Sequence, residues 1–149
     1  MRFVTTGSVL FAVSLIYLCT PAAGLADNTV ALAELQTRAD QAQPRDRCFL
    51  YAQLVSRMTE LAGQQFNSGD FGRASDTLKL VQRYADKIRS ATADDSKNIK
   101  NAALLLEHTS YRLNEILRAA PYEARPALSE TLKQLNQVQA QLMIQVFKK

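Results

Sequence analysis

Few residues of this chain could carry catalytic chemistry, and only one short stretch brings several of them together. His108 is the only histidine among 149 residues, which argues against a metal site or haem held by two histidines. It also leaves a Ser-His-Asp triad with one candidate base. With Glu107 and Tyr111, it is the local candidate set for a small enzyme or ligand carrier with an interhelical pocket. Because His108 falls off the apolar line through Leu106 and Leu113, we expect it at the surface or at its boundary.

Other polar features of the sequence have structural explanations. Asp94 and Asp95 form the one pair of adjacent carboxylates, and they suit the positive end of a helix dipole. Gly69 and Gly72 are close together but belong to a predicted turn, so they do not form a phosphate-binding loop. We therefore predict no catalytic residues, no cofactor and no metal site.

The composition indicates one folded, helical domain. Hydrophobic residues make up 47% of the chain and charged residues 21%, which is unlike a disordered protein. Ala, Leu, Gln, Glu, Lys and Arg are abundant, and this composition favours helix over sheet. The net charge of +4 is too small and too dispersed to indicate a nucleic-acid surface.

The first 26 residues have the three-part pattern of a secretory signal peptide. Arg2 precedes an apolar run over residues 9–19, and Gly24 and Ala26 are small residues placed as at a cleavage site. We expect cleavage near Ala26 and export of the mature chain, to the periplasm or as a secreted protein. The alternative is an uncleaved segment that tethers the protein to a membrane. Residues 3–26 carry no charge and are long enough to span a bilayer, which requires about 20 apolar residues. A lipoprotein anchored at Cys19 is a third possibility, although the bulky Leu18 fits that motif poorly.

Cleavage would leave Cys48 as the sole thiol of the mature chain, and two interpretations follow. In the first, Cys48 is a buried core residue. In the second, Arg45 and Arg47 near a helix start after Pro44 lower its pKa and make it a reactive thiol, able to form an intermolecular disulfide.

Apolar residues recur at spacings of three and four in five stretches, which predicts five helices. Asn28 is the expected cap of the first, and Pro44 ends it or begins the second, which runs over about 45–67. Pro121 and Pro126 bracket the turn before the last helix. The expected inward stripes are Leu32, Leu35, Ala39 and Ala42; Leu50, Leu54, Met58, Leu61 and Gln65, widened by Tyr51, Val55, Ala62 and Phe66 beside them; Phe71, Ala74, Leu78, Val81, Ala85 and Ile88; Ile99, Ala102, Leu106, Thr109, Leu113, Ile116 and Ala120; and Leu128, Leu132, Leu135, Val138, Leu142 and Val146.

A turn at Gly69-Asp70-Phe71 separates the second helix from the third. Gly69 suits the left-handed conformation that closes a helix, and Asp70 suits the cap of the next. Residues 55–88 resemble one tetratricopeptide (TPR) hairpin: Leu61-Ala62 stands at the family's Leu-Gly pair, Gly69-Asp70-Phe71 at its turn, and Ala74 at its small position. The resemblance implies two antiparallel helices.

The same resemblance does not imply capture of a peptide tail. Peptide-binding TPR proteins carry Lys and Asn on the inner face of the first helix, where this chain has Thr59 and Gly63. No second copy of the turn is present, and a repeat array needs about three units.

The sequence thus predicts an all-α fold: a signal peptide over 1–26, followed by a single domain over 27–149 that forms a five-helix antiparallel bundle. The TPR-like hairpin occupies about 45–90 and a long C-terminal helical pair about 94–147. The expected function is non-enzymatic: an interaction or scaffold module that binds a protein partner or itself. The wide stripe of the second helix and the apolar end near Ile144 and Phe147 motivate this expectation. No nucleic-acid partner is predicted. Contact with a membrane is predicted only if the N-terminal segment remains uncleaved.

Overall fold

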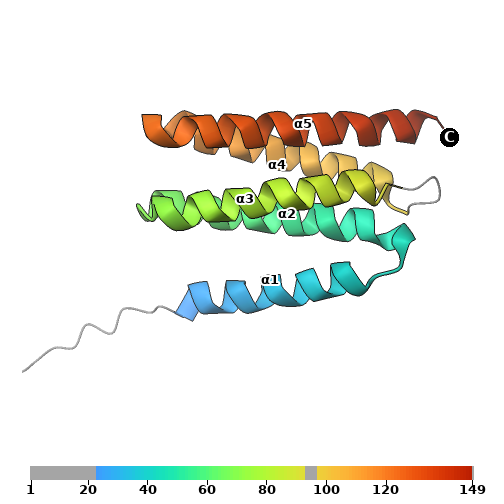
Figure 1. Cartoon of the computed structure of the whole chain (residues 1–149), viewed down its shortest axis with the longest axis horizontal. Coiled ribbons are helices and arrows are strands. Elements are labelled where there is room, and N and C mark those ends of the chain that lie inside the picture. Colours follow the sequence, from blue (N-terminus) through green and yellow to red (C-terminus); the bar gives the residue numbers. More distant parts are fainter. Residues whose placement is uncertain (1–22, 93–96, 149) are drawn as a thin grey trace, which may run out of the picture.

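The computed structural model describes residues 23–92 and 97–148, and over these ranges the chain is helical with no β-strand. The elements are α1 (Ala23–Gln41), α2 (Pro44–Asn67), α3 (Phe71–Ser90), α4 (Ile99–Ala119), a short 3₁₀ turn η1 (Tyr122–Ala124) and α5 (Arg125–Phe147), arranged as in Figure 1. The predicted all-α class is confirmed.

The residue type at the helix start explains where α2 begins, whereas the predicted start of α1 is wrong. Pro44 occupies the first turn of α2, where its missing N–H removes no helical hydrogen bond, so it begins the second helix. Asn28 is not a cap, because α1 already begins at Ala23. Asp94 and Asp95 lie outside the described residues, and α4 follows Asn98, which adopts a left-handed φ of 60°.

The turn between α2 and α3 has the predicted chemistry. Gly69 has a φ of 78°, a left-handed conformation that closes α2 at low steric cost only for a residue without a Cβ. The N–H of Asp70 donates to the carbonyl of Gln65 (2.9 Å), and its carboxylate accepts from the N–H of Arg73 (3.3 Å). Asp70 therefore closes α2 through its N–H and caps α3 through its carboxylate.

The inward stripe of α3 is buried from Ala74 onward, but not at its first position. Ala74 is fully buried, whereas Phe71 is 48% exposed. Its ring lies 6.1 Å from that of Phe66 across the turn. Phe71 thus covers the turn instead of entering the core.

The two hairpins α2–α3 and α4–α5 lie side by side, with α2 against α4 and α3 against α5 (Figure 1). Because the connection from α3 to α4 is short, α4 begins at the end of the bundle where α3 stops. Consequently α2 and α4 run parallel, as do α3 and α5. The predicted antiparallel arrangement holds within each hairpin and between α1 and α2, but not between the hairpins.

The core lies between the hairpins. Leu54, Leu78, Leu106 and Leu135 are among its largest fully buried side chains, one from each of the four helices. Leu142 is buried near the end of α5, while Ile144 and Phe147 are exposed by 55% and 78%. Most of the apolar stripes predicted for these helices therefore face a common interior.

Polar and small residues set the contacts between the hairpins. Gln134 on α5 donates to the carbonyl of Gln82 (3.0 Å) and to Asp86 Oδ1 (2.9 Å) on α3. On the other side, Gly63 on α2 meets α4 so closely that an added Cβ would lie 2.9 Å from Ile116 Cδ1. The absence of a side chain at Gly63 thus allows this close approach.

Replacing Gly69 by alanine should lower the free energy of unfolding by about 1 kcal/mol or more, because an L side chain is strained at positive φ. No atom lies within 4 Å of the added Cβ, so the loss comes from the backbone alone. Gly72→Ala is the matched control: its Cβ also meets nothing within 4 Å, and its φ is not positive. That variant should be neutral or more stable by up to about 1 kcal/mol. Urea denaturation measures both, and equal losses would contradict the assignment.

Candidate interaction groove beside helix α2

The predicted polar set on α4 does not form an interhelical pocket. Glu107, His108 and Tyr111 all lie on the exposed face of the helix, and Tyr111 is 70% exposed. Three side chains directed into solvent from one helix cannot enclose a ligand. His108 is therefore a surface residue, as its place off the apolar line indicates.

Cys48 is a core residue in this structure. Its side chain is fully buried, and burial raises its pKa to about 11, although a hydrogen bond with Thr92 opposes this effect. Of the two neighbouring arginines, Arg47 is engaged elsewhere, because its Nε donates to the carbonyl of Ala42 (2.8 Å). A raised pKa is the opposite of what the reactive-thiol interpretation required, so that interpretation is corrected.

No set of three or more His, Cys, Asp or Glu residues suited to a metal ion occurs within residues 23–92 and 97–148. In the same ranges, none of the helices combines the length and apolar character needed to cross a bilayer. The predicted signal peptide lies mainly in residues 1–22, outside the described part, as does Cys19. The predicted cleavage position near Ala26 falls in the first turns of α1.

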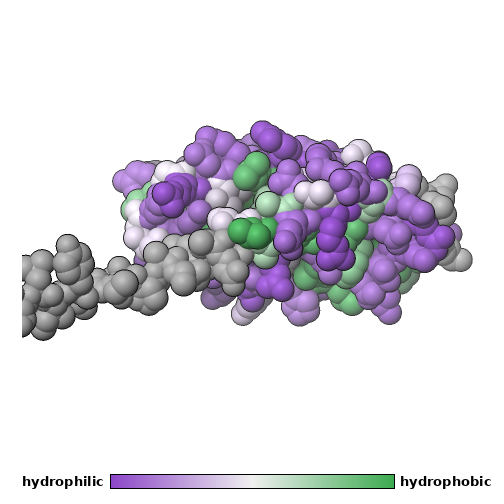
Figure 2. Space-filling model, turned by 90° about the horizontal axis from the view of Figure 1, so that it is seen from below, coloured by the Kyte–Doolittle hydropathy of each residue, from purple (hydrophilic) through white to green (hydrophobic). Residues whose placement is uncertain are grey.

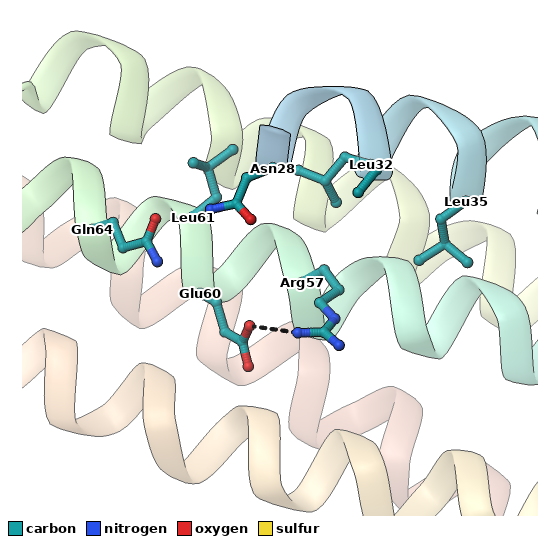
Figure 3. Close-up of a pocket in the computed structure, with 8 residues that line it drawn as sticks. Asn28, Leu32, Leu35, Arg57, Glu60, Leu61 and Gln64 are labelled. Carbon is teal, nitrogen blue, oxygen red and sulfur yellow. Dashed lines mark hydrogen bonds and ion pairs between the residues drawn. The ribbon is translucent and has the colours of Figure 1, made fainter. Parts of the chain in front are cut away.

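A groove runs along α2 between α1 and α4, and we call it the α2 groove. Its first part has a volume of about 450 Å³ and is lined by Leu32 and Leu35 of α1 and by Arg57, Glu60 and Leu61 of α2. Asn28 and Gln64 stand at one end (Figure 3). Viewed from the α1 side, the surface shows apolar side chains between hydrophilic ones (Figure 2).

The second part of the groove continues toward α4. It has a volume of about 400 Å³ and is lined by Gln53 and Ser56 of α2 and Leu105 of α4, with Leu35, Arg57 and Glu60 common to both parts. Because the two parts share these three residues, they adjoin each other along α2.

Two residues of the α2 floor belong to a charged triad. Glu60 accepts a hydrogen bond from Arg57 Nη1 (3.3 Å) and another from Arg112 Nη1 of α4. The arginine side chains are 69% and 56% exposed, and that of Glu60 is 32% exposed. Two guanidinium groups and one carboxylate leave one positive charge in excess. Arg57 and Glu60 line both parts of the groove, and Arg112 reaches Glu60 from α4 without lining either part.

The far end of α1 is held by a second polar cluster, which we call the α1 joint. Asp40 Oδ1 accepts from the Tyr51 hydroxyl and from Lys87 Nζ, both at 2.9 Å. Lys87 Nζ also lies 5.3 Å from the centroid of the Tyr51 ring and 4.9 Å from that of Tyr84. The joint thus ties α1 to α2 and α3 through hydrogen bonds, an ion pair and two cation–π contacts.

The joint shifts the pKa of both charged partners. The hydrogen bond from Lys87, and then that from Tyr51, lowers the pKa of Asp40 below 3.8. The hydrogen bond with Asp40 raises the pKa of Lys87 above 10.5. The contribution of Asp40 to stability is therefore present above its ordinary pKa and is lost as pH falls through the lowered value. That of Lys87 is present below 10.5 and is lost as pH rises through the raised value.

No protein-family model, curated protein or solved structure matches the chain. The TPR resemblance over residues 55–88 therefore stays a prediction, although this stretch does fall within the α2–α3 hairpin.

Sequence reasoning missed both polar clusters. Arg57 and Glu60 are visible in the sequence as an i,i+3 pair, but Arg112 lies 52 residues beyond Glu60. Lys87 lies 47 residues beyond Asp40. Only the packing of the helices brings these partners together.

Replacing Asp40 by asparagine should loosen α1 more than the rest of the fold. At about pH 7 we expect faster amide hydrogen exchange in α1, equivalent to less than about 1 kcal/mol, since the partners are partly exposed. The difference from wild type should shrink as pH falls through the lowered pKa of Asp40, because the carboxylate then becomes protonated in the folded state as well.

The control for this variant is Asp76→Asn. Asp76 pairs with Lys79 (3.0 Å) on the surface of α3, at side-chain exposures of 77% and 70%. Its loss should leave exchange in α1 unchanged. Identical exchange profiles for the two variants would show that the α1 joint does not hold α1.

Cys48 should resist thiol reagents in the folded protein. In a Cys19→Ser chain, Ellman's reagent at about pH 8 should react with Cys48 at least about 100-fold more slowly before unfolding than after it, because the thiol is buried and its pKa raised. A Ser129→Cys variant in a chain lacking both native cysteines provides the exposed control, since Ser129 is solvent-exposed. Rapid labelling of native Cys48 would restore the reactive-thiol interpretation.

Proposed function

We propose that this protein is a non-enzymatic interaction or scaffold module that acts outside the cytoplasm and binds a protein partner in the α2 groove. The observation that carries the proposal is the composition of the groove, in which Arg57 and Glu60 lie between leucines of two flanking helices and Arg112 reaches Glu60 from α4. Apolar walls and accessible arginines are typical of protein-binding surfaces.

The dimensions of the groove support a peptide segment as its occupant. The floor extends along α2 from Gln53 to Gln64, about 16 Å at 1.5 Å per residue. A partner segment of about three helical turns covers that length. The two flanking helices would contact such a segment from both sides, as in recognition of a helix by a groove.

Export is supported by the N-terminal pattern and by the placement of the remaining thiol. Cleavage after Ala26 would leave Leu32 and Leu35 in α1, so the groove keeps its wall. It would also leave Cys48 as the sole thiol of the mature chain, and this side chain is buried. A mature chain of this kind offers no exposed thiol to an oxidising compartment.

Site-specific photo-crosslinking in the native cells tests the binding proposal. A photoreactive residue at Gln53, on the floor of the groove, should give an adduct of defined mass. The same residue at Glu130, on the exposed side of α5, should not. Adducts from Glu130 alone would move the interaction to the α5 surface. A mass equal to two copies of the chain would identify self-association.

Sequencing of the N-terminus of the protein recovered from the same cells tests the export proposal. A chain that begins at Asp27 supports cleavage. A chain that begins at Met1 in the membrane fraction would favour the membrane-tethered scaffold, and recovery at Met1 from the cytoplasm would refute export.

A further inference from the structure

We infer that the α2 groove selects an amphipathic peptide segment whose carboxylate side chain is flanked by apolar side chains. This inference rests on the proposed function, since it names the class of partner for the same groove. It depends on two features of the described residues: spare hydrogen-bond donors on the floor and leucines on both walls.

The charged triad leaves donor capacity unused. A guanidinium group carries five N–H donors, and Arg57 and Arg112 each direct one nitrogen to Glu60. Both side chains remain more than half exposed, and Arg57 lines the groove, so further donors of the triad are accessible to a ligand there. A second carboxylate placed beside Glu60 would neutralise the excess positive charge and accept charge-assisted hydrogen bonds from either arginine.

The walls require apolar groups on each side of that carboxylate. Leu32 and Leu35 of α1 are partly buried on one side, and Leu105 of α4 is partly buried on the other. A segment with a central Asp or Glu and leucine-like residues three or four positions away would fill both walls while its carboxylate meets the floor.

Nucleic acid fits this groove poorly. Its binding depends on neutralising many phosphates, whereas the triad offers one net positive charge beside apolar walls. A peptide carboxylate matches the charge of the site, and its apolar neighbours match the walls.

Selection of a random 16-residue peptide library against the full chain tests the inference. Enriched peptides should share an acidic residue flanked by apolar residues. Synthetic versions with Glu replaced by Gln should bind about tenfold more weakly, the effect of losing one charge-assisted contact of about 1.4 kcal/mol.

The protein variants locate the contact. Arg57→Gln and Arg112→Gln should together weaken the acidic peptide about tenfold, and the Glu-to-Gln difference should disappear when both arginines are replaced. Arg118→Gln is the matched control on α4, because Arg118 is 71% exposed and pairs with Glu115 at i,i+3 as a local surface pair. It should leave binding unchanged.

The outcomes separate the two claims. Enriched peptides without a shared carboxylate, or with binding that ignores both arginines, would overturn this inference and leave the proposed interaction function standing. A library that yields no binder above background would overturn both. Circular dichroism of each variant confirms that loss of binding is not loss of fold, and both arginines are exposed enough for the fold to tolerate replacement.

Discussion

The packing of the α2–α3 hairpin on the α4–α5 hairpin is the interaction on which the rest of the architecture depends. At Gly63, where α2 meets α4, an added Cβ would lie 2.9 Å from Ile116 Cδ1, closer than side-chain carbons pack, so Ile116 would have to move. Glycine inside a helix costs about 1 kcal/mol relative to alanine, and here it leaves room for the Ile116 side chain between the first helices of the two hairpins. Because α4 and α1 pack on different sides of α2, its outward face is left between them. The groove is thus a consequence of how the hairpins stack.

The other wall of the groove is the least anchored part of the fold. Among the α1 side chains whose burial is described, Ala39 alone is fully buried, and Leu32 and Leu35 are partly exposed. Elements with little buried apolar surface open at low free energy. The α1 joint opposes this opening at the C-terminal end of the helix, through Asp40 and its partners.

The sequence predicts which residues face inward much better than it predicts which helices are neighbours. Periodicity places Leu106 and Leu113 correctly in the core because burial repeats with the helical turn. Gly69 is identifiable because positive φ selects so strongly for glycine. Asn28 fails as a cap because a good capping residue does not stop a helix that has already begun. The groove could not be predicted, because the contact between Glu60 and Arg112 depends on a parallel pairing that periodicity does not specify.

The positions that bind peptides in TPR proteins are not available for binding in this structure. In the predicted TPR alignment, Thr59 and Gly63 occupy the positions where peptide-binding TPR proteins carry their clamp. Both are buried here, with Thr59 Oγ1 donating to the carbonyl of Val55 (2.9 Å). Residues at these positions face α4, not solvent, so no substitution there could create a clamp without disrupting the stack of hairpins. The accessible face of α2 is instead the one that carries Arg57 and Glu60. Any recognition by this helix must therefore use side chains that the resemblance does not point to, and their chemistry has to be derived from their own charges and neighbours.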